Sequence, residues 1–503
     1  MLCYIEKRPM LMCAILCIII SVIGFYSAVL LFLAGWVILF CLCIFILTNR
    51  KGTTVISFAL VLIFVFILFF KIEQINSLNR LDNTEHISYI TVYEQVKEAD
   101  DYYTAYAEVI ESTTLKKGTR ICVSYSGEQI KIGQALKANI KLSSISEEYA
   151  PSYYSKNIFL FASMGEYEEV PSKHDFIISA VDNVRDYIKQ TLYSNMDFSK
   201  ASTMLALLMG DKNYFTKSFA SNVVFSGVSH AMVVSGMHLT IIVMLFTGIF
   251  NKFCYNKYLK VIAIFIVVIA LTALCGFSIS MQRAGITHLL CAVSILLKKK
   301  GKPENTLGTA VFIILVCSPF AVMSVAFELS VAATFGILAI ALPIDNYVNQ
   351  KGIIGSKILK LIFSASLITL SATLITSPIV LVNFGGVSTV CVITNLLISY
   401  AVTLALSLSV IALILNLFLP FAARVLFSIT EIVIEYINSV INYFGELKYS
   451  YINVPKGYFV AVIAIIILIF WYMLACKRRR NVIRLEQVKQ KFIKEGGKKL
   501  KWR

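Results

Sequence analysis

Polar side chains that could do chemistry recur inside the most apolar part of this sequence, where solubility in lipid alone would not require them. Residues 226–243 read SGVSHAMVVSGMHLTIIV and contain His230, Ser235, Gly236 and His238. Polar groups at membrane depth are costly, so they usually face other protein groups or water. On one continuous helix the two histidines would lie about 80° apart, and Gly236 favours a break between Ser235 and His238. The segment predicts either a close helix crossing or a polar-lined passage.

Arg283, in the later stretch GFSISMQRAGITHLL, is the strongest single signal. A guanidinium keeps its charge at ordinary pH and costs about 2.5–3.5 kcal/mol at the centre of a membrane helix. Glu328 is the only carboxylate inside the nearby spans, so one interpretation is a structural ion pair between Arg283 and Glu328. The other is that Arg283 faces an aqueous path and contacts a passing phosphate. Ser330 and Asn395 add polar groups to later spans.

Motifs of three enzyme classes can be tested against the sequence. The HExxH motif of zinc proteases and the GxxxxGK[ST] motif of ATP-driven motors are both absent. An intramembrane serine hydrolase that uses Ser235 and a histidine such as His288 is an alternative, although Val233 stands where the GxSG motif of such proteases has glycine. We expect a channel or transporter rather than an enzyme, with no catalytic residue, no metal site and no cofactor.

The composition indicates a membrane protein. The chain has 503 residues, of which 58% are hydrophobic and 15% charged, whereas soluble domains carry about 25% charged residues. Apolar runs long enough to cross a hydrocarbon core of about 30 Å recur along the chain. We predict an α-helical polytopic membrane protein with about 10–12 transmembrane helices. Nearly all of the 12 cysteines lie in or beside apolar runs, which is typical of buried small hydrophobic residues.

Changes of composition divide the chain into five parts. Residues 1–71 contain N-terminal transmembrane helices at about 10–28, 29–48 and 54–71, and residues 72–175 are polar. An amphipathic, interfacial linker occupies 176–218, a transmembrane channel core 219–476, and a basic tail 477–503. Within the core, the stretch 387–447 could cross the membrane, lie flat or re-enter.

The polar segment at 72–175 has the alternation of half-buried strands. The runs YTAYAEVIES, TRICVSYS, QALKANIKL and NIFLFASM alternate apolar and polar residues, and KKGTR and SGEQ read as turns. Four or five short strands predict a small β-barrel or sandwich, and an OB-like barrel fits that count. The segment is acidic overall, so it would not bind nucleic acid over its whole surface. We expect Tyr102, Tyr103 and Tyr106 to pack in the sheet rather than to stack on bases.

Charge predicts the orientation. The chain carries a net charge of +17, and the tail after residue 476 is strongly basic. Because cytoplasmic segments next to spans are rich in Lys and Arg, we place the tail and the basic links between spans in the cytoplasm, where the tail would meet anionic lipid. The β domain is then extracytoplasmic. A contact between the tail and nucleic acid is the alternative reading.

Four ordered motifs between about residues 200 and 400 resemble the ComEC competence family. The first, ALLMGDKNYF followed by FSGVSHAMVVSGMHLTIIV, includes Gly210, Asp211 and Gly227. GFSISMQRAG resembles an arginine–alanine segment of the family. SPFAVMSVAFELSVAATFGI resembles a third motif, with Glu328 in place of its glutamine, and TSPIVLVNFGGVSTVCVITNLL resembles a fourth. The N-terminal plan of a few helices followed by a β domain is also similar to that of the family.

The resemblance implies a channel of the bacterial inner membrane for single-stranded DNA in natural transformation. It places along the DNA path the polar residues named above: His230, Ser235, Gly236, His238, Arg283, Ser330 and Asn395. A negative charge at Glu328 would repel DNA unless it pairs with Arg283, which favours the ion pair. A transporter for another anionic solute, built on the same fold, is a further alternative.

The resemblance also implies partners. They are single-stranded DNA, membrane lipid, a DNA receptor and a cytoplasmic helicase or ATPase, and the protein could form a homo-oligomer. Many family members continue into a metallo-β-lactamase-like domain, but HxHxDH is absent from this chain. We therefore expect no nuclease activity here, so degradation of one strand would need a separate nuclease.

Overall fold

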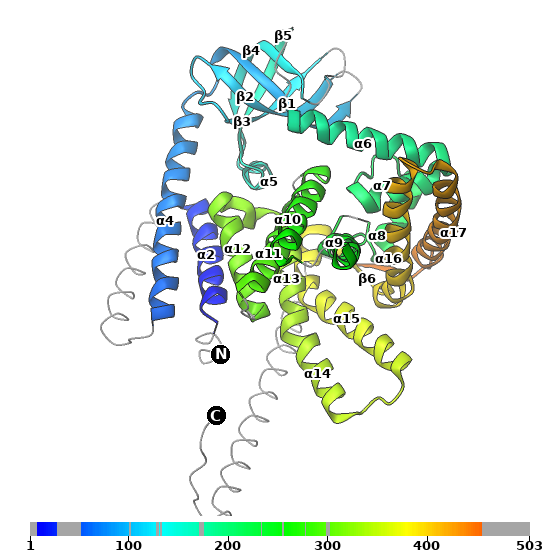
Figure 1. Ribbon diagram of the computed structural model, residues 1–503. Coiled ribbons are helices and arrows are strands. Elements are labelled where there is room, and N and C mark those ends of the chain that lie inside the picture. Colours follow the sequence, from blue (N-terminus) through cyan, green and yellow to red (C-terminus); the bar gives the residue numbers. More distant parts are fainter. Residues whose placement is uncertain are drawn as a thin grey trace, which may run out of the picture.

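The computed structural model describes residues 8–27, 52–99, 102–126, 130, 133–170, 176–232, 234–253, 256–276, 278–297 and 302–454. A β-barrel lies at one end of a body of helices (Figure 1). Seven described helices are long and apolar enough to cross a membrane, and three shorter apolar helices accompany them. The protein is therefore a mostly helical, polytopic membrane protein. The predicted helix at 29–48 and the last span before residue 477 lie outside the described residues.

The first described helices form a compact group beside the barrel. Helix α2 (Pro9–Tyr26) packs against α4 (Gly52–Asn79) and α12 (Pro303–Cys317). A Cβ on Gly308 of α12 would lie 2.5 Å from the backbone of Met10, so only glycine permits this close crossing. Arg8 and Glu304 form an ion pair of 2.7 Å at the same end of the two helices. Helix α4 continues beyond the predicted end at residue 71 and leads to the barrel (Figure 1).

Five strands close the barrel in the order β1-β2-β3-β5-β4. They are β1 (Glu85–Ala99), β2 (Tyr102–Ser112), β3 (Arg120–Tyr125), β4 (Ala135–Ser144) and β5 (Ile158–Val170), and the short helix α5 (Ala150–Tyr154) precedes β5. Only β3 and β5 pair in parallel. The four predicted runs coincide with β2 to β5, and the KKGTR turn joins β2 to β3. The SGEQ turn falls largely outside the described residues.

The tyrosines and the one cysteine of the barrel lie in two clusters, because Tyr106 and Cys122 pack against α5 outside the barrel and Tyr103 and Tyr125 pack with its interior residues. Tyr106 is buried, and the ring of Tyr103 stacks on Tyr125 at 5.5 Å, so both rings pack in the sheet as predicted. Tyr102 is exposed. Burial raises the pKa of Cys122 to about 11, so its thiol stays protonated and poorly reactive at neutral pH.

Three helices connect the barrel to the membrane core: α6 (Phe176–Asn195), α7 (Phe198–Met209) and α8 (Lys217–Phe225). Arg185 of α6 donates from Nε to the Leu274 carbonyl over 2.9 Å and from Nη2 to the Ala273 carbonyl over 3.2 Å. These carbonyls end α10 (Lys257–Leu274), where the last turn of a helix leaves acceptors without intrahelical partners. Arg185 therefore caps α10 and fixes α6 against it.

The remaining core elements follow in chain order. They are α9 (Gly236–Phe253), α11 (Ile279–Leu297), η1 (Pro319–Met323), α13 (Val325–Gly336), η2 (Ile337–Ala341), α14 (Leu342–Lys351), α15 (Lys357–Phe384), β6 (Gly386–Ser388), α16 (Cys391–Asn416), α17 (Pro420–Gly445) and β7 (Tyr451–Asn453). Helices α14 and α15 extend away from the barrel (Figure 1). Helices α16 and α17 pack against each other, so the ambiguous stretch 387–447 is largely two packed helices of 26 residues each.

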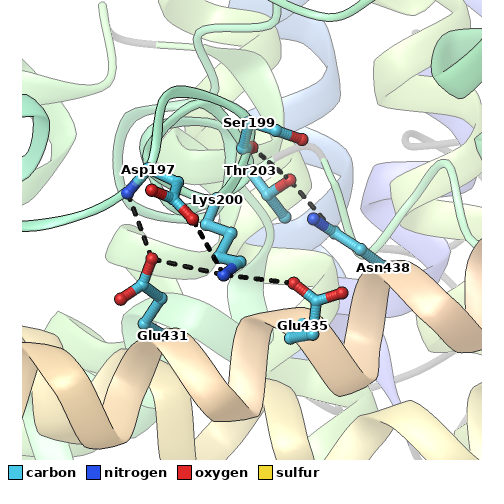
Figure 2. Close-up of polar contacts among 7 residues, drawn as sticks. All are labelled: Asp197, Ser199, Lys200, Thr203, Glu431, Glu435 and Asn438. Atoms are coloured by element: carbon cyan, nitrogen blue, oxygen red, sulfur yellow. Dashed lines mark hydrogen bonds and ion pairs between the residues drawn. The ribbon is translucent and has the colours of Figure 1, made fainter.

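A charged cluster fixes α7 against α17 (Figure 2). The Lys200 ammonium lies 3.0 Å from Asp197, 3.3 Å from Glu431 and 3.2 Å from Glu435. Beside it, Thr203 donates to the side chain of Asn438 over 3.0 Å. The hydrogen bond from Lys200 lowers the pKa of the Asp197 carboxyl. The carboxylate therefore stays charged at neutral pH, and its contribution to stability is lost only as the pH falls through this lowered pKa.

Replacing Lys200 with methionine should lower the melting temperature of the detergent-purified protein by about 2–4 °C, because three carboxylates lose their shared cation. Differential scanning fluorimetry measures the shift. Adding Glu431→Gln and Glu435→Gln to Lys200→Met should recover part of it, since the repulsion is then removed. A melting temperature that does not respond to Lys200→Met at low salt would contradict this role of the cluster.

Candidate functional site

The segment between α8 and α9 is a turn inside the helical body. The described residues from 226 to 235, which omit 233, have no regular helix, and α9 begins at Gly236. Gly227 has φ +75°, in the left-handed region that favours glycine. The break predicted near Gly236 is therefore present, and it is longer than one residue. Irregular backbone at membrane depth is tolerated only where it packs in protein or lines a water-filled space.

Gly227 places this turn directly against the start of α16. A Cβ on Gly227 would lie 2.4 Å from Cys391 Cβ and 2.8 Å from Ser388 Oγ. Ser388 belongs to β6, which pairs antiparallel with β7. A Cβ on Gly386 of β6 would lie 2.6 Å from the ring of Tyr451 in β7. Two glycines thus allow the turn, β6 and β7 to form one closely packed layer.

The end of α7, at Gly210, also lies against this turn. Gly210 caps α7 with φ +79°, and a Cβ there would lie 3.3 Å from Val234 Cγ2. The Gly210–Asp211 step therefore lies directly against the residues that precede α9. The segments around residues 210 and 234, which are separate in sequence, can approach this closely because Gly210 has no side chain.

Arg283 reaches the first residue of α9 from α11. Its Nη2 lies 3.5 Å from the position that a Cβ on Gly236 would take, and the Cβ of Ala284 lies 3.0 Å from the same point. Arg283 Nε donates to Ser330 Oγ of α13 over 2.6 Å. One guanidinium therefore connects the start of α9, the second turn of α11 and the first half of α13.

Several polar atoms around the turn are buried and have no hydrogen-bond partner among the described residues. His238 is only 1% exposed, and its Nδ1 accepts from the Ser235 backbone N–H over 3.3 Å. Its other nitrogen, Nε2, has no partner, and neither do Ser388 Oγ and Asn395 Nδ2. Asn395 follows Cys391 by four residues on α16, so the two share a helix face. Buried polar groups are nearly always satisfied, so such a group of exceptions indicates a place for water or ligand.

His230 differs from His238 in its environment. His230 is exposed, whereas His238 is buried. His230 lies in the turn, and His238 lies eight residues later in the first turn of α9. The structure therefore brings His230, Ser235, Gly236 and His238 together at the turn, with Arg283 and Ser330 on one side and Asn395 on α16, which packs against α9.

A family model described as "Competence protein" matches residues 207–479. The chain belongs to this family. The match begins in α7 and includes the turn, Arg283, Ser330 and the start of α16, so the competence-family region contains every residue of the site described above. The resemblance inferred from the four motifs is confirmed. No curated protein and no solved structure matches the chain.

In this competence-family protein, the ion pair expected between Arg283 and Glu328 is not formed among the described residues. Arg283 hydrogen-bonds to Ser330 instead, and Glu328 is half-buried. Glu328 and Ser330 are two residues apart on α13, which places them about 200° apart around the helix axis. A guanidinium on the Ser330 face is thus turned away from Glu328. The sequence identified both charged residues, but it did not show which face of α13 is turned toward Arg283.

The geometry also bears on the hydrolase alternative. His288 Nε2 lies 2.9 Å from Thr240 Oγ1, and Thr240 in turn donates to the Gly236 carbonyl. Ser235 contacts His238 through its backbone N–H rather than its hydroxyl. Within the described part of the chain, no histidine is hydrogen-bonded to the Ser235 hydroxyl. That part also contains no group of three or more His, Cys, Asp or Glu residues that could hold a metal ion.

Sequence reasoning missed two members of the site, Ser388 and Cys391. Both lie in the FGGVSTVC stretch, which carried part of the family resemblance, but neither residue is unusual by type. Their importance arises from the contact with Gly227, more than 160 positions earlier in the chain. The signal in the sequence was the fourth family motif, which Ser388 matches by type, although the motif does not indicate the contact with Gly227.

Proposed function

We propose that this competence-family protein is an inner-membrane channel for the uptake of single-stranded DNA. The observation that carries the proposal is Arg283. Its permanent charge lies at the junction of three helices and contacts a neutral hydroxyl, and within the described residues no carboxylate pairs with it. A charge without a counterion at membrane depth is costly, and a passing phosphate would supply the counterion.

The start of α9 supports an anionic substrate. The first turn of a helix presents N–H groups without intrahelical partners and the positive end of the helix dipole. Here that turn begins at Gly236, beside the guanidinium of Arg283. The unpaired polar atoms of His238, Ser388 and Asn395 would bind water or the sugar and phosphate groups of a strand. We assign His230 and Ser235 to the lining of the same path.

The contacts at Gly236 imply that the path is closed in this conformation. A Cβ on Gly236 would already lie 3.0 Å from Ala284 Cβ, so α9 and α11 leave no room between them for a nucleotide at this level. Passage of a strand would require these two helices to separate. The same holds for the turn and α16, which meet at Gly227.

We infer roles for the other parts of the chain from the same proposal. The five-stranded barrel is an OB-like, extracytoplasmic domain that precedes the channel, and the basic tail is cytoplasmic. A DNA receptor outside the membrane, a cytoplasmic helicase or ATPase and a separate nuclease complete the system.

Bacterial cells that lack this chain should lose uptake of labelled DNA and regain it on complementation. Normal uptake of DNA with loss of another anion would instead favour the solute-transporter alternative.

Replacing Ser235 with alanine distinguishes the channel from a serine hydrolase. Alanine keeps the backbone N–H that donates to His238, so a channel should retain uptake within about twofold of wild type. A hydrolase that uses the Ser235 hydroxyl as nucleophile would lose its activity. The measurement is the amount of labelled DNA that enters cells, normalised to the amount of protein in the membrane. Complete loss of uptake at a normal protein level would contradict the channel assignment.

A further inference from the structure

A cavity of about 270 Å³ lies between α9 and α10, away from the site described above. Its walls are mostly apolar and include Val243 and Phe246 of α9 and Ile264 and Val267 of α10. Lys257 and Lys260, in the first turn of α10, also line it. The cavity therefore combines an apolar interior with two cations at one end.

The two lysines have no acidic counterpart nearby in the chain. Neither α9 nor α10 contains an Asp or a Glu, and within the described residues neither Lys257 nor Lys260 forms an ion pair. The Lys257 ammonium lies 5.0 Å from the centre of the Tyr258 ring, an aromatic neighbour but not a counterion. Two unneutralised cations at the mouth of an apolar cavity favour a ligand with an anionic head and an apolar chain.

The position of the lysines along α10 matches the surface of a bilayer. Helix α10 is one of the seven candidate spans, and its 18 residues extend about 27 Å. Its far end is capped by Arg185 of α6, the first helix after the barrel. The lysines therefore lie at the end of α10 that is remote from α6, where a hydrocarbon core would give way to phosphate headgroups.

We propose that this cavity binds one anionic phospholipid from the leaflet opposite the barrel. Lys257 and Lys260 contact the headgroup phosphate, and part of one acyl chain lies between α9 and α10 against Phe246 and Ile264. The lipid would cover the apolar faces of both helices. Because α9 begins at Gly236, a lipid bound along α9 would stabilise the position of this helix within the bundle.

Native mass spectrometry of the full chain purified in detergent tests the proposal. The probes are phosphatidylglycerol and phosphatidylcholine with the same acyl chains. We expect the wild-type protein to bind one phosphatidylglycerol at least about tenfold more tightly than phosphatidylcholine, and Lys257→Gln and Lys260→Gln each to weaken that binding about fivefold. The matched control, Lys357→Gln with Lys360→Gln, removes two lysines of α15 and should change nothing. Equal binding of the two lipids by wild type would overturn the proposal.

Two further arms distinguish the lipid from its headgroup alone. Ala263→Phe fills the cavity and leaves both lysines in place, so it should abolish selective binding, whereas Ile262→Phe on the exposed side of α10 should not. Millimolar inorganic phosphate should not displace the lipid, because it offers no chain for the apolar walls. Displacement by phosphate, or unchanged lipid binding in Ala263→Phe, would show that the lysines hold an anion without the cavity and would overturn the proposal.

Discussion

Replacing Arg283 with glutamine should reduce uptake of labelled single-stranded DNA by about 10- to 100-fold, the cost of one hydrogen bond to a charged group. The glutamine amide can still donate to Ser330, so the change removes the charge and retains a neutral contact between α11 and α13. A strand that carries one charge per phosphate would then cross the junction of α9, α11 and α13 without a cationic partner.

Two related variants separate charge from packing at Arg283. Arg283→Lys keeps a cation but presents a single ammonium in place of the planar group, so we expect partial activity. Ser330→Ala removes the neutral acceptor and leaves the charge, so uptake should fall only a few-fold. Each variant is compared at equal amounts in the membrane. If Arg283→Gln takes up DNA as the wild type does, the phosphate path proposed here is wrong.

Replacing Gly227 with alanine should destabilise the helical core by about 2–5 kcal/mol. A left-handed backbone costs a residue with a side chain about 1–2 kcal/mol, and forcing a methyl group into a packed interior costs about 1–3 kcal/mol more. The new Cβ would lie 2.4 Å from Cys391 Cβ and 2.8 Å from Ser388 Cβ, well inside contact distance. The turn and α16 would have to separate.

The amount of Gly227→Ala protein in the membrane and its melting temperature in detergent measure this effect. Gly248→Ala is the matched control, because Gly248 lies on α9 with no atom within 4 Å of an added Cβ. That control should be neutral or slightly stabilising, since alanine is the better helix former. Adding Cys391→Gly to Gly227→Ala removes the closest overlap and should recover part of the loss. Equal stability of Gly227→Ala and Gly248→Ala would refute the close contact.

Local pattern predicted local structure well in this protein. Alternating residues identified β2 to β5, and the glycine before His238 indicated the break where α9 begins. Strand β1 was not identified, because its pairing with β2 shifts register at three places, between Tyr89 and Ile90 and again at two points before Lys97. Each shift interrupts the strict alternation on which the prediction depends.

Contacts between distant elements could not be read from the sequence. Arg283 was predicted to need a partner, but the choice between Glu328 and Ser330 depends on how α13 is rotated against α11, which no spacing within either helix determines. Likewise, Ser388 and Cys391 became part of the site only because Gly227 lets two backbones approach. The family motifs indicated which residues belong together and left open which of them touch.

The pairing of β6 with β7 connects the last described strand to the turn at Gly227. Ser388 in β6 touches the turn at Gly227, while β7 ends at Asn453 and Val454 donates to the Gly385 carbonyl over 2.9 Å. Val454 is therefore hydrogen-bonded to the residue before β6, and β6 packs against the turn. A displacement at Val454 would therefore reach β6 through backbone hydrogen bonds, and would reach Gly227 through its packing against Ser388 and Cys391.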